Sequence, residues 1–138
     1  MKTESMVDPG AHRPYGVKVL YDIGVPMSDG IRLSADLYLP TKSDGPFPTI
    51  LYRTPYSNQL EYLIERANFF SQNGYAVVCQ DVRGRYDSGG EFRRWVNEFD
   101  DGHETIEWIG SQTWCDGNVG MDGASYLGYV QWQTASMG

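Results

Sequence analysis

A serine at position 125, flanked by small residues, is the side chain of this 138-residue sequence best suited to covalent chemistry. It lies in the segment Gly-Ala-Ser-Tyr-Leu-Gly at residues 123–128, after a short apolar run at residues 119–121. A tight turn from a strand into a helix exposes a serine hydroxyl to a carbonyl, and small neighbours leave room for the substrate. The first N–H groups of the following helix favour the negative charge that develops there. Ser125 is therefore a candidate nucleophile.

The spacing of this motif leaves two interpretations open. The stricter motif is Gly-x-Ser-x-Gly, but here Leu127 occupies the place of the second glycine, and the glycine is Gly128. Taken alone, the segment fits a glycine-rich loop as well as a nucleophile. The elements that precede it must decide between the two.

Two alternating segments predict an antiparallel pair of strands early in the chain. Apolar side chains alternate with polar or smaller ones in residues 17–25 and in residues 33–39, the period of a half-buried strand. Asp29 and Gly30 lie between them, and this dipeptide is a strong hairpin signal. Residues 1–16 lack such a pattern, and we interpret them as a loose N-terminal tail.

Alternating strands and helices follow. Residues 47–52 and 75–79 are continuous apolar runs, typical of strands covered on both faces. Asn58 followed by Glu61 predicts a capped helix start, and Gly74 predicts the end of that helix. Strand, helix and strand in this order predict a parallel βαβ unit.

The alternation continues as far as the serine. Asp101 with Glu104 predicts the start of a second helix, residues 119–121 a short strand, and Ser125 the turn into a third helix. The fold class is therefore α/β, with an antiparallel β-hairpin followed by parallel βαβ units, as in the N-terminal part of an α/β-hydrolase fold.

Composition excludes several classes of function. The net charge of −7 argues against nucleic-acid binding, and no segment has the apolar length of a signal peptide or a membrane span. Cys79 and Cys115 form neither a metal pair nor a disulfide framework, so we expect a cytoplasmic protein. The loop at residues 81–91 lacks the alternating carboxylates of a calcium site, and we expect Asp81 and Arg83 to order it by hydrogen bonds. No cofactor or metal is expected.

Five sequence blocks together resemble one family, the CocE/NonD serine hydrolases, which include cocaine esterase, α-amino-acid ester hydrolases and Xaa-Pro dipeptidyl-peptidases. The resemblance is to the N-terminal part of these enzymes and runs from about Val17 to the C-terminus. Because five blocks occur in the right order, it is far more specific than the serine motif alone. The blocks lie at residues 53–56, 74–78, 81–92, 114–121 and 123–128.

The resemblance implies three roles. Ser125 would be the acylated nucleophile, the backbone N–H of Tyr126 would bind the oxyanion, and the phenol of Tyr56 would be the second donor. Physical chemistry agrees, because an oxyanion hole commonly takes one N–H from the residue after the nucleophile, and a phenol at neutral pH can donate. The alternative for Tyr56 is a packing aromatic beside Pro55.

Hydrolases of this fold also use an acidic residue and a histidine that follow the serine in the chain. Neither type follows Ser125, since His12 and His103 both precede it, and a solvated or packed helix residue is the simpler interpretation of His103. We therefore expect residues 17–138 to be the N-terminal part of an α/β-hydrolase domain, truncated after the nucleophile turn. An uncovered sheet edge would then allow self-association.

The sequence thus supports two hypotheses. The first is a serine hydrolase that cleaves a small ester, an amide or a short peptide through an acyl-enzyme at Ser125. The second is a non-catalytic α/β fragment or binding module whose serine is not activated. Asp122 departs from the family, and its carboxylate could be solvated, be paired with an arginine, or perturb the site.

Overall fold

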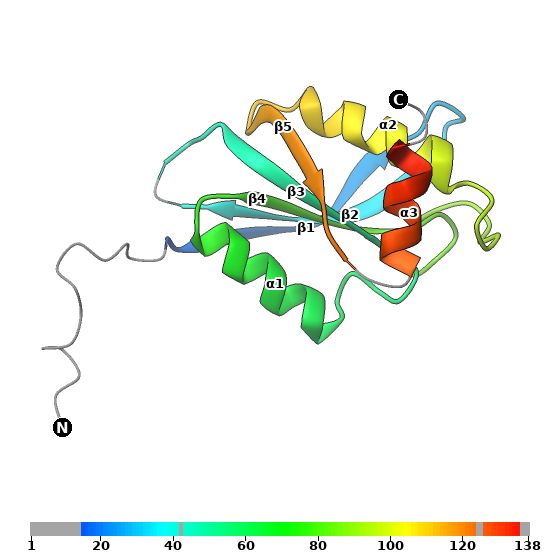
Figure 1. Cartoon of the computed structure of the whole chain (residues 1–138), viewed down its shortest axis with the longest axis horizontal. Helices are drawn as coiled ribbons and strands as arrows, with labels where there is room; N and C mark the ends of the chain where they lie inside the picture. Colours follow the sequence, from blue (N-terminus) through cyan, green and yellow to red (C-terminus); the bar gives the residue numbers. More distant parts are fainter. Residues whose placement is uncertain (1–14, 42, 124–125, 136–138) are drawn as a thin grey trace, which may run out of the picture.

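Five strands form one mixed sheet in the order β1-β2-β4-β3-β5 (Figure 1). The computed structural model describes residues 15–41, 43–123 and 126–135, so the expected tail lies mostly outside the described residues. The strands are β1 (Val17–Pro26), β2 (Arg32–Pro40), β3 (Phe47–Thr54), β4 (Ala76–Asp81) and β5 (Cys115–Met121).

The predicted hairpin is confirmed. Strands β1 and β2 pair antiparallel, and their turn closes through a hydrogen bond from the Gly30 N–H to the Met27 carbonyl at 3.0 Å. Gly30 has a φ of +87°, a conformation that glycine adopts without a steric penalty. The Asp29-Gly30 pair therefore predicted the turn correctly, because the turn places its glycine at a positive φ.

The predicted βαβ unit is also confirmed, with one correction at its helix start. Strands β3 and β4 pair in parallel, and α1 (Glu61–Gln72) connects them and ends before Gly74, whose φ is +97°. The expected cap by Asn58 is wrong, because the helix begins after Leu60 without a side-chain cap. The amide of Asn58 instead donates to the Cys79 carbonyl of β4 at 3.2 Å.

The second half of the chain differs from its prediction at two boundaries. Helix α2 (Glu98–Gly110) begins three residues before Asp101, and Glu98 in its first turn forms a buried ion pair with Arg53. Strand β5 begins at Cys115 and is longer than the predicted residues 119–121. Helix α3 (Tyr126–Ala135) begins where a helix was expected, one residue after Ser125 in the sequence.

The sheet separates two cores, because successive side chains of a strand point to opposite faces. On one face, Leu51 and Val78 pack with Ile109 of α2. On the other, Tyr52 and Val77 belong to the cluster that packs against α1. Figure 1 shows α1 on one side of the sheet and α2 on the other, so the α/β prediction is confirmed. Among the described residues, no helix is long and apolar enough to span a membrane.

Candidate active site

The parallel strands β3, β4 and β5 end at the same edge of the sheet. In open α/β sheets, ligands bind outside the carboxyl ends of such strands. Three segments meet at this edge: the loop after β3, which carries Tyr56, the loop between β4 and α2, and the first turn of α3 (Figure 1). The segments that carry Tyr56 and Tyr126, the two predicted oxyanion residues, are thus brought to one place.

Ser125 itself lies outside the described residues, together with Ala124. The residues on both sides of them are described. Gly123 has a φ of +127°, and a Cβ added to it would lie 2.5 Å from Cβ of Leu127. Both observations require glycine there. Position 123 is therefore a true turn glycine, in agreement with a tight turn between β5 and α3.

Tyr56 projects from the loop after β3 and is 46% exposed. Its backbone N–H donates to the Thr54 hydroxyl at 2.9 Å, which fixes the loop close to the strand end. Its ring meets the ring of Tyr126 edge to face, with 6.5 Å between centroids. The structure therefore places the two predicted oxyanion residues side by side.

The side chain of Tyr126 holds the start of α3 in place. Its ring is buried and stacks on Trp95 with centroids 4.1 Å apart, and its hydroxyl accepts a hydrogen bond from the Trp95 N–H at 3.3 Å. Burial raises the pKa of Tyr126 to about 12, so this phenol stays neutral at physiological pH. The anchored ring thus fixes the first residue of α3 against Trp95.

A buried polar network lies beneath this edge, and no sequence motif predicted it. Arg53, fully buried near the end of β3, donates from Nε to Gln80 at 2.7 Å and from Nη1 to Glu98 at 3.0 Å. Gln80 in turn donates to Thr105 of α2 at 3.0 Å. Burial raises the pKa of Glu98, although the charge of Arg53 opposes this. An arginine in an apolar strand could have signalled the network, since a buried charge needs a partner.

Asp122 is paired, which selects one of its three interpretations. Its carboxylate accepts hydrogen bonds from the Tyr52 hydroxyl at 2.7 Å and from Arg66 at 3.0 Å. Burial and the bond to Asp122 raise the pKa of Tyr52. The carboxylate therefore links the end of β5 to β3 and α1.

Hydrogen bonds order the loop at residues 81–91, as expected. Arg83 bonds to Asp101 at 2.8 Å and to Asp29 at 2.7 Å. The Asp81 carboxylate accepts the Asn58 N–H at 2.7 Å, while its Oδ2 is buried without a hydrogen-bond partner among the described residues. Burial raises the pKa of Asp81 to about 6. No group of three metal-ligating side chains occurs within the described ranges.

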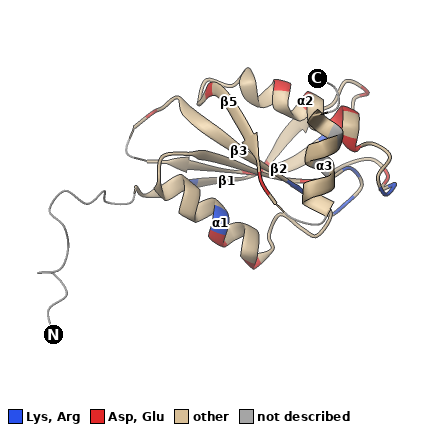
Figure 2. Ribbon diagram, in the orientation of Figure 1, with Lys and Arg blue, Asp and Glu red and all other residues tan. Residues whose placement is uncertain are grey.

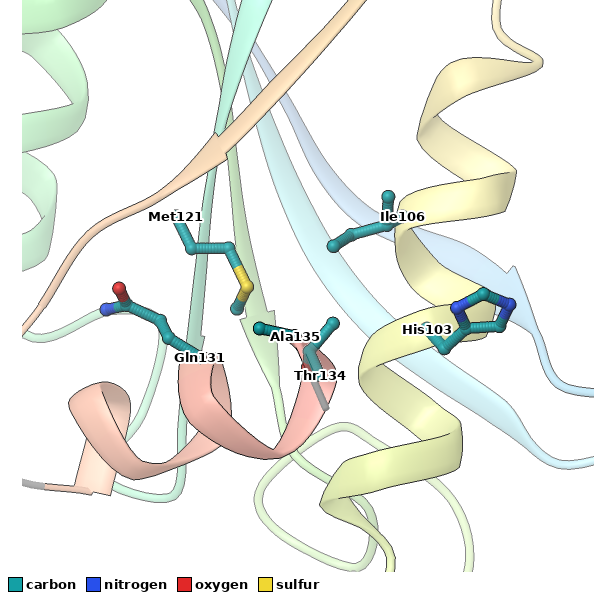
Figure 3. A pocket seen from close by; sticks show the side chains of 6 residues that line it. All are labelled: His103, Ile106, Met121, Gln131, Thr134 and Ala135. Carbon is teal, nitrogen blue, oxygen red and sulfur yellow. The ribbon is translucent and has the colours of Figure 1, made fainter. Parts of the chain in front are cut away.

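His103 borders a different cavity from Tyr56. This hollow of about 340 Å³ lies between α2, α3 and β5, and Figure 3 shows Ile106 and Met121 directed into it and the imidazole turned away from Met121. The His103 Nε2 lies 3.1 Å from the Glu107 carboxylate on the same helix. His103 is thus a partly exposed helix residue, and His12 lies outside the described residues.

Two smaller cavities flank Tyr56. One, of about 180 Å³, is mostly apolar and is bordered by Leu60, Leu63 and Leu127. The other, of about 210 Å³, is bordered by Tyr126, Phe92 and two arginines. A group bound at Tyr56 can therefore extend in two directions with different chemical character.

Comparison with known proteins places most of this chain in one family. Residues 29–138 match the family described as X-Pro dipeptidyl-peptidase (S15 family). The chain is 48% identical over 124 residues to cocaine esterase from Rhodococcus sp. (strain MB1 Bresler), covering 87% of this chain and 21% of that protein. It is 37% identical over 126 residues to a putative serine esterase of Mycobacterium bovis, covering 75% of this chain and 20% of the relative.

The fold of this chain is also similar to those of solved hydrolase structures. A CocE/NonD family hydrolase from Staphylococcus aureus superposes with a TM-score of 0.76 at 26% identity, covering 94% of this chain and 31% of that one. An α-amino acid ester hydrolase superposes with a TM-score of 0.68 at 29% identity, covering 92% of this chain and 24% of that one. The chain thus spans about a fifth of the length of the curated relatives it matches.

Proposed function

The chain belongs to the X-Pro dipeptidyl-peptidase (S15) family of hydrolases, and we propose that it carries the nucleophile and both oxyanion donors of a serine hydrolase. The reaction is cleavage of a small ester, an amide or a short peptide through an acyl-enzyme on Ser125. Tyr126 and Tyr56 bind the oxyanion.

The observation that carries this proposal is the meeting of Tyr56 and Tyr126 at the carboxyl end of the sheet. One residue comes from the loop after β3, and the other begins α3 directly after Ser125 in the sequence. An oxyanion hole in this kind of site takes its donors from these two places. Tyr56 is exposed enough to meet a substrate, whereas the buried ring of Tyr126 leaves only its backbone N–H as a donor for the oxyanion.

In the proposed reaction, the Ser125 oxygen attacks the carbonyl carbon while a general base takes its proton. The carbonyl oxygen becomes negatively charged and accepts hydrogen bonds from the Tyr126 N–H and the Tyr56 O–H. Collapse of this intermediate breaks the bond to the alcohol or amine, which leaves with the proton held by the base. Water then attacks the acyl-enzyme, gives a proton to the base, and releases the acid as Ser125 takes that proton back. In hydrolases of this fold the base is a histidine that follows the nucleophile in the chain, a position that neither His12 nor His103 occupies.

Labelling with a fluorophosphonate probe tests the proposal against a non-catalytic α/β module. We expect the natural polypeptide that contains this chain to be labelled, and Ser125→Ala to abolish the labelling. Ser111→Ala, at the exposed end of α2, is the matched control and should leave it unchanged. A folded sample without labelling, or labelling that survives Ser125→Ala, would favour the non-catalytic module.

A further inference from the structure

The arginines of this chain divide into two groups. Most of the described arginines pair with a carboxylate, namely Arg32, Arg53, Arg66, Arg83 and Arg93. Within the described residues, Arg85 and Arg94 form no ion pair, although the chain carries a net charge of −7 and offers many acidic groups. Figure 2 shows basic segments in the loop that leads from β4 to α2, where these two residues lie.

Both unpaired arginines border the same cavity, the one of about 210 Å³ beside Tyr56. Its other borders are Pro55, Phe92 and Tyr126. The cavity is therefore bordered by two arginines and, with Tyr56, by three aromatic residues. The cavity adjoins the two residues to which the proposed function assigns the oxyanion.

Aromatic rings and one carbonyl hold the guanidinium groups. Arg85 donates from Nε to the Pro55 carbonyl at 3.0 Å and lies 5.2 Å from the centroid of the Phe92 ring. Arg94 lies 5.0 Å from the centroid of the Trp95 ring. A guanidinium has five N–H donors, so these contacts leave most donors available to a ligand. Stacking restrains each group without neutralising its charge.

We propose that this cavity binds an anionic group of the substrate, so that the preferred esters or amides carry a carboxylate close to the reacting carbonyl. The proposal rests on the proposed function for the position of that carbonyl. Guanidinium groups bind carboxylates through paired N–H donors, and the aromatic walls suit a small planar body. A cationic group of the same shape is repelled.

Three probes of similar shape and different charge test the proposal without turnover: benzoate, benzamide and benzamidinium. Their binding to this chain is measured by NMR titration of the Tyr126 amide and arginine Nε–H signals. We expect benzoate to bind about twofold to fivefold more tightly than benzamide, the range for ion pairs of exposed groups, and benzamidinium to bind most weakly. Equal affinity for benzoate and benzamide would overturn the proposal.

Matched variants assign the preference to the cavity. Arg85→Gln and Arg94→Gln should each reduce the benzoate preference, and Arg94→Lys should retain most of it. Arg93→Gln removes the same charge from the same loop, but Arg93 pairs with Glu91 and does not border the cavity, so the preference should persist. An equal loss in Arg93→Gln and Arg94→Gln would show a general charge effect and contradict the proposal.

The two proposals fail separately. Loss of the benzoate preference with intact Ser125 labelling contradicts only the anion site, whereas a retained preference without labelling contradicts only the hydrolase. If Arg85→Gln does not fold, as judged by circular dichroism, Arg94→Gln decides the test. The Arg94 side chain is exposed, and among the described residues its guanidinium group stacks only on the Trp95 ring, so we expect Arg94→Gln to fold.

Discussion

Arg53 and Glu98 form an ion pair of 3.0 Å whose side chains are 0% and 3% exposed. The pair joins the end of β3 to the first turn of α2, next to the segment that contacts Tyr126. A buried charge without its partner is very costly, whereas an intact pair contributes little net stability. The two residues therefore depend on each other, since each is tolerated in the interior only while its partner is present.

Breaking this pair should destabilise the protein strongly. We expect Arg53→Met and Glu98→Gln each to lower the free energy of unfolding by about 3–5 kcal/mol, since each leaves a buried polar group uncompensated. Urea denaturation measures the loss. In the double variant the loss should be smaller than the sum of the two. Arg93→Gln, which breaks an exposed pair, is the control and should change stability little. Additive losses would show that the two residues act independently.

Removal of the Tyr56 hydroxyl should slow the proposed reaction. Tyr56→Phe keeps the ring contact with Tyr126 but deletes one oxyanion donor, which typically costs about 2.7–4 kcal/mol of transition-state stabilisation, or roughly 10²–10³ in kcat. Steady-state kinetics of the natural polypeptide should show this fall with little change in KM. Tyr62→Phe, in the neighbouring apolar cavity, is the control. A Tyr56→Phe variant with full kcat would exclude the assigned role.

The stability of the protein should depend on pH through Asp81. This fully buried carboxyl has its pKa raised from 3.8 to about 6, first by burial and then by the charges of Asp87 and Asp36. The folded state therefore holds the proton more tightly than the unfolded state. The free energy of unfolding falls as pH rises from about 4 to 6, and the loss, about 3 kcal/mol for a shift of roughly two units, persists above pH 6.

The variant Asp81→Asn isolates this contribution. The variant lacks the titrating carboxyl, so its free energy of unfolding should not show the fall that Asp81 causes between pH 4 and pH 6. Relative to the parent protein, the stability of the variant in urea denaturation should therefore increase between pH 4 and pH 7. The difference between the two proteins across pH is the readout, because the new amide adds a buried donor whose cost does not vary with pH. Parallel pH profiles for the two proteins would contradict the assignment to Asp81.

We also expect this chain to self-associate. Strand β5 ends the sheet and pairs only with β3 among the described strands, and Trp132 on α3 is 81% exposed. Unpaired strand edges and large exposed apolar groups favour association. Sedimentation velocity should show a dimer population that grows with concentration and that Trp132→Glu reduces. Phe69→Glu on α1, the matched exposed aromatic residue, should have less effect. A monomer at every concentration would contradict this expectation.

Local sequence signals predicted most of the elements because their causes are local. Asp29 and Gly30 suit a tight hairpin turn, Gly74 suits the end of a helix, and two continuous apolar runs suit buried parallel strands. Five ordered blocks then indicated the family, which the comparison confirmed.

Only the tertiary structure decided which side chains meet. Asn58 donates a hydrogen bond to β4 and does not cap α1. Arg53 of β3 pairs with Glu98 at the start of α2. Asp122 accepts a hydrogen bond from Tyr52, which lies 70 positions earlier in the sequence. Hydrophobic periodicity indicates which face of an element is buried, but it carries no information about the partner of a polar group far along the chain. The sequence motif predicted that Tyr56 contributes to the site of the serine. It did not predict that Arg85 and Arg94 border the same cavity as Tyr56, which only the folded structure shows.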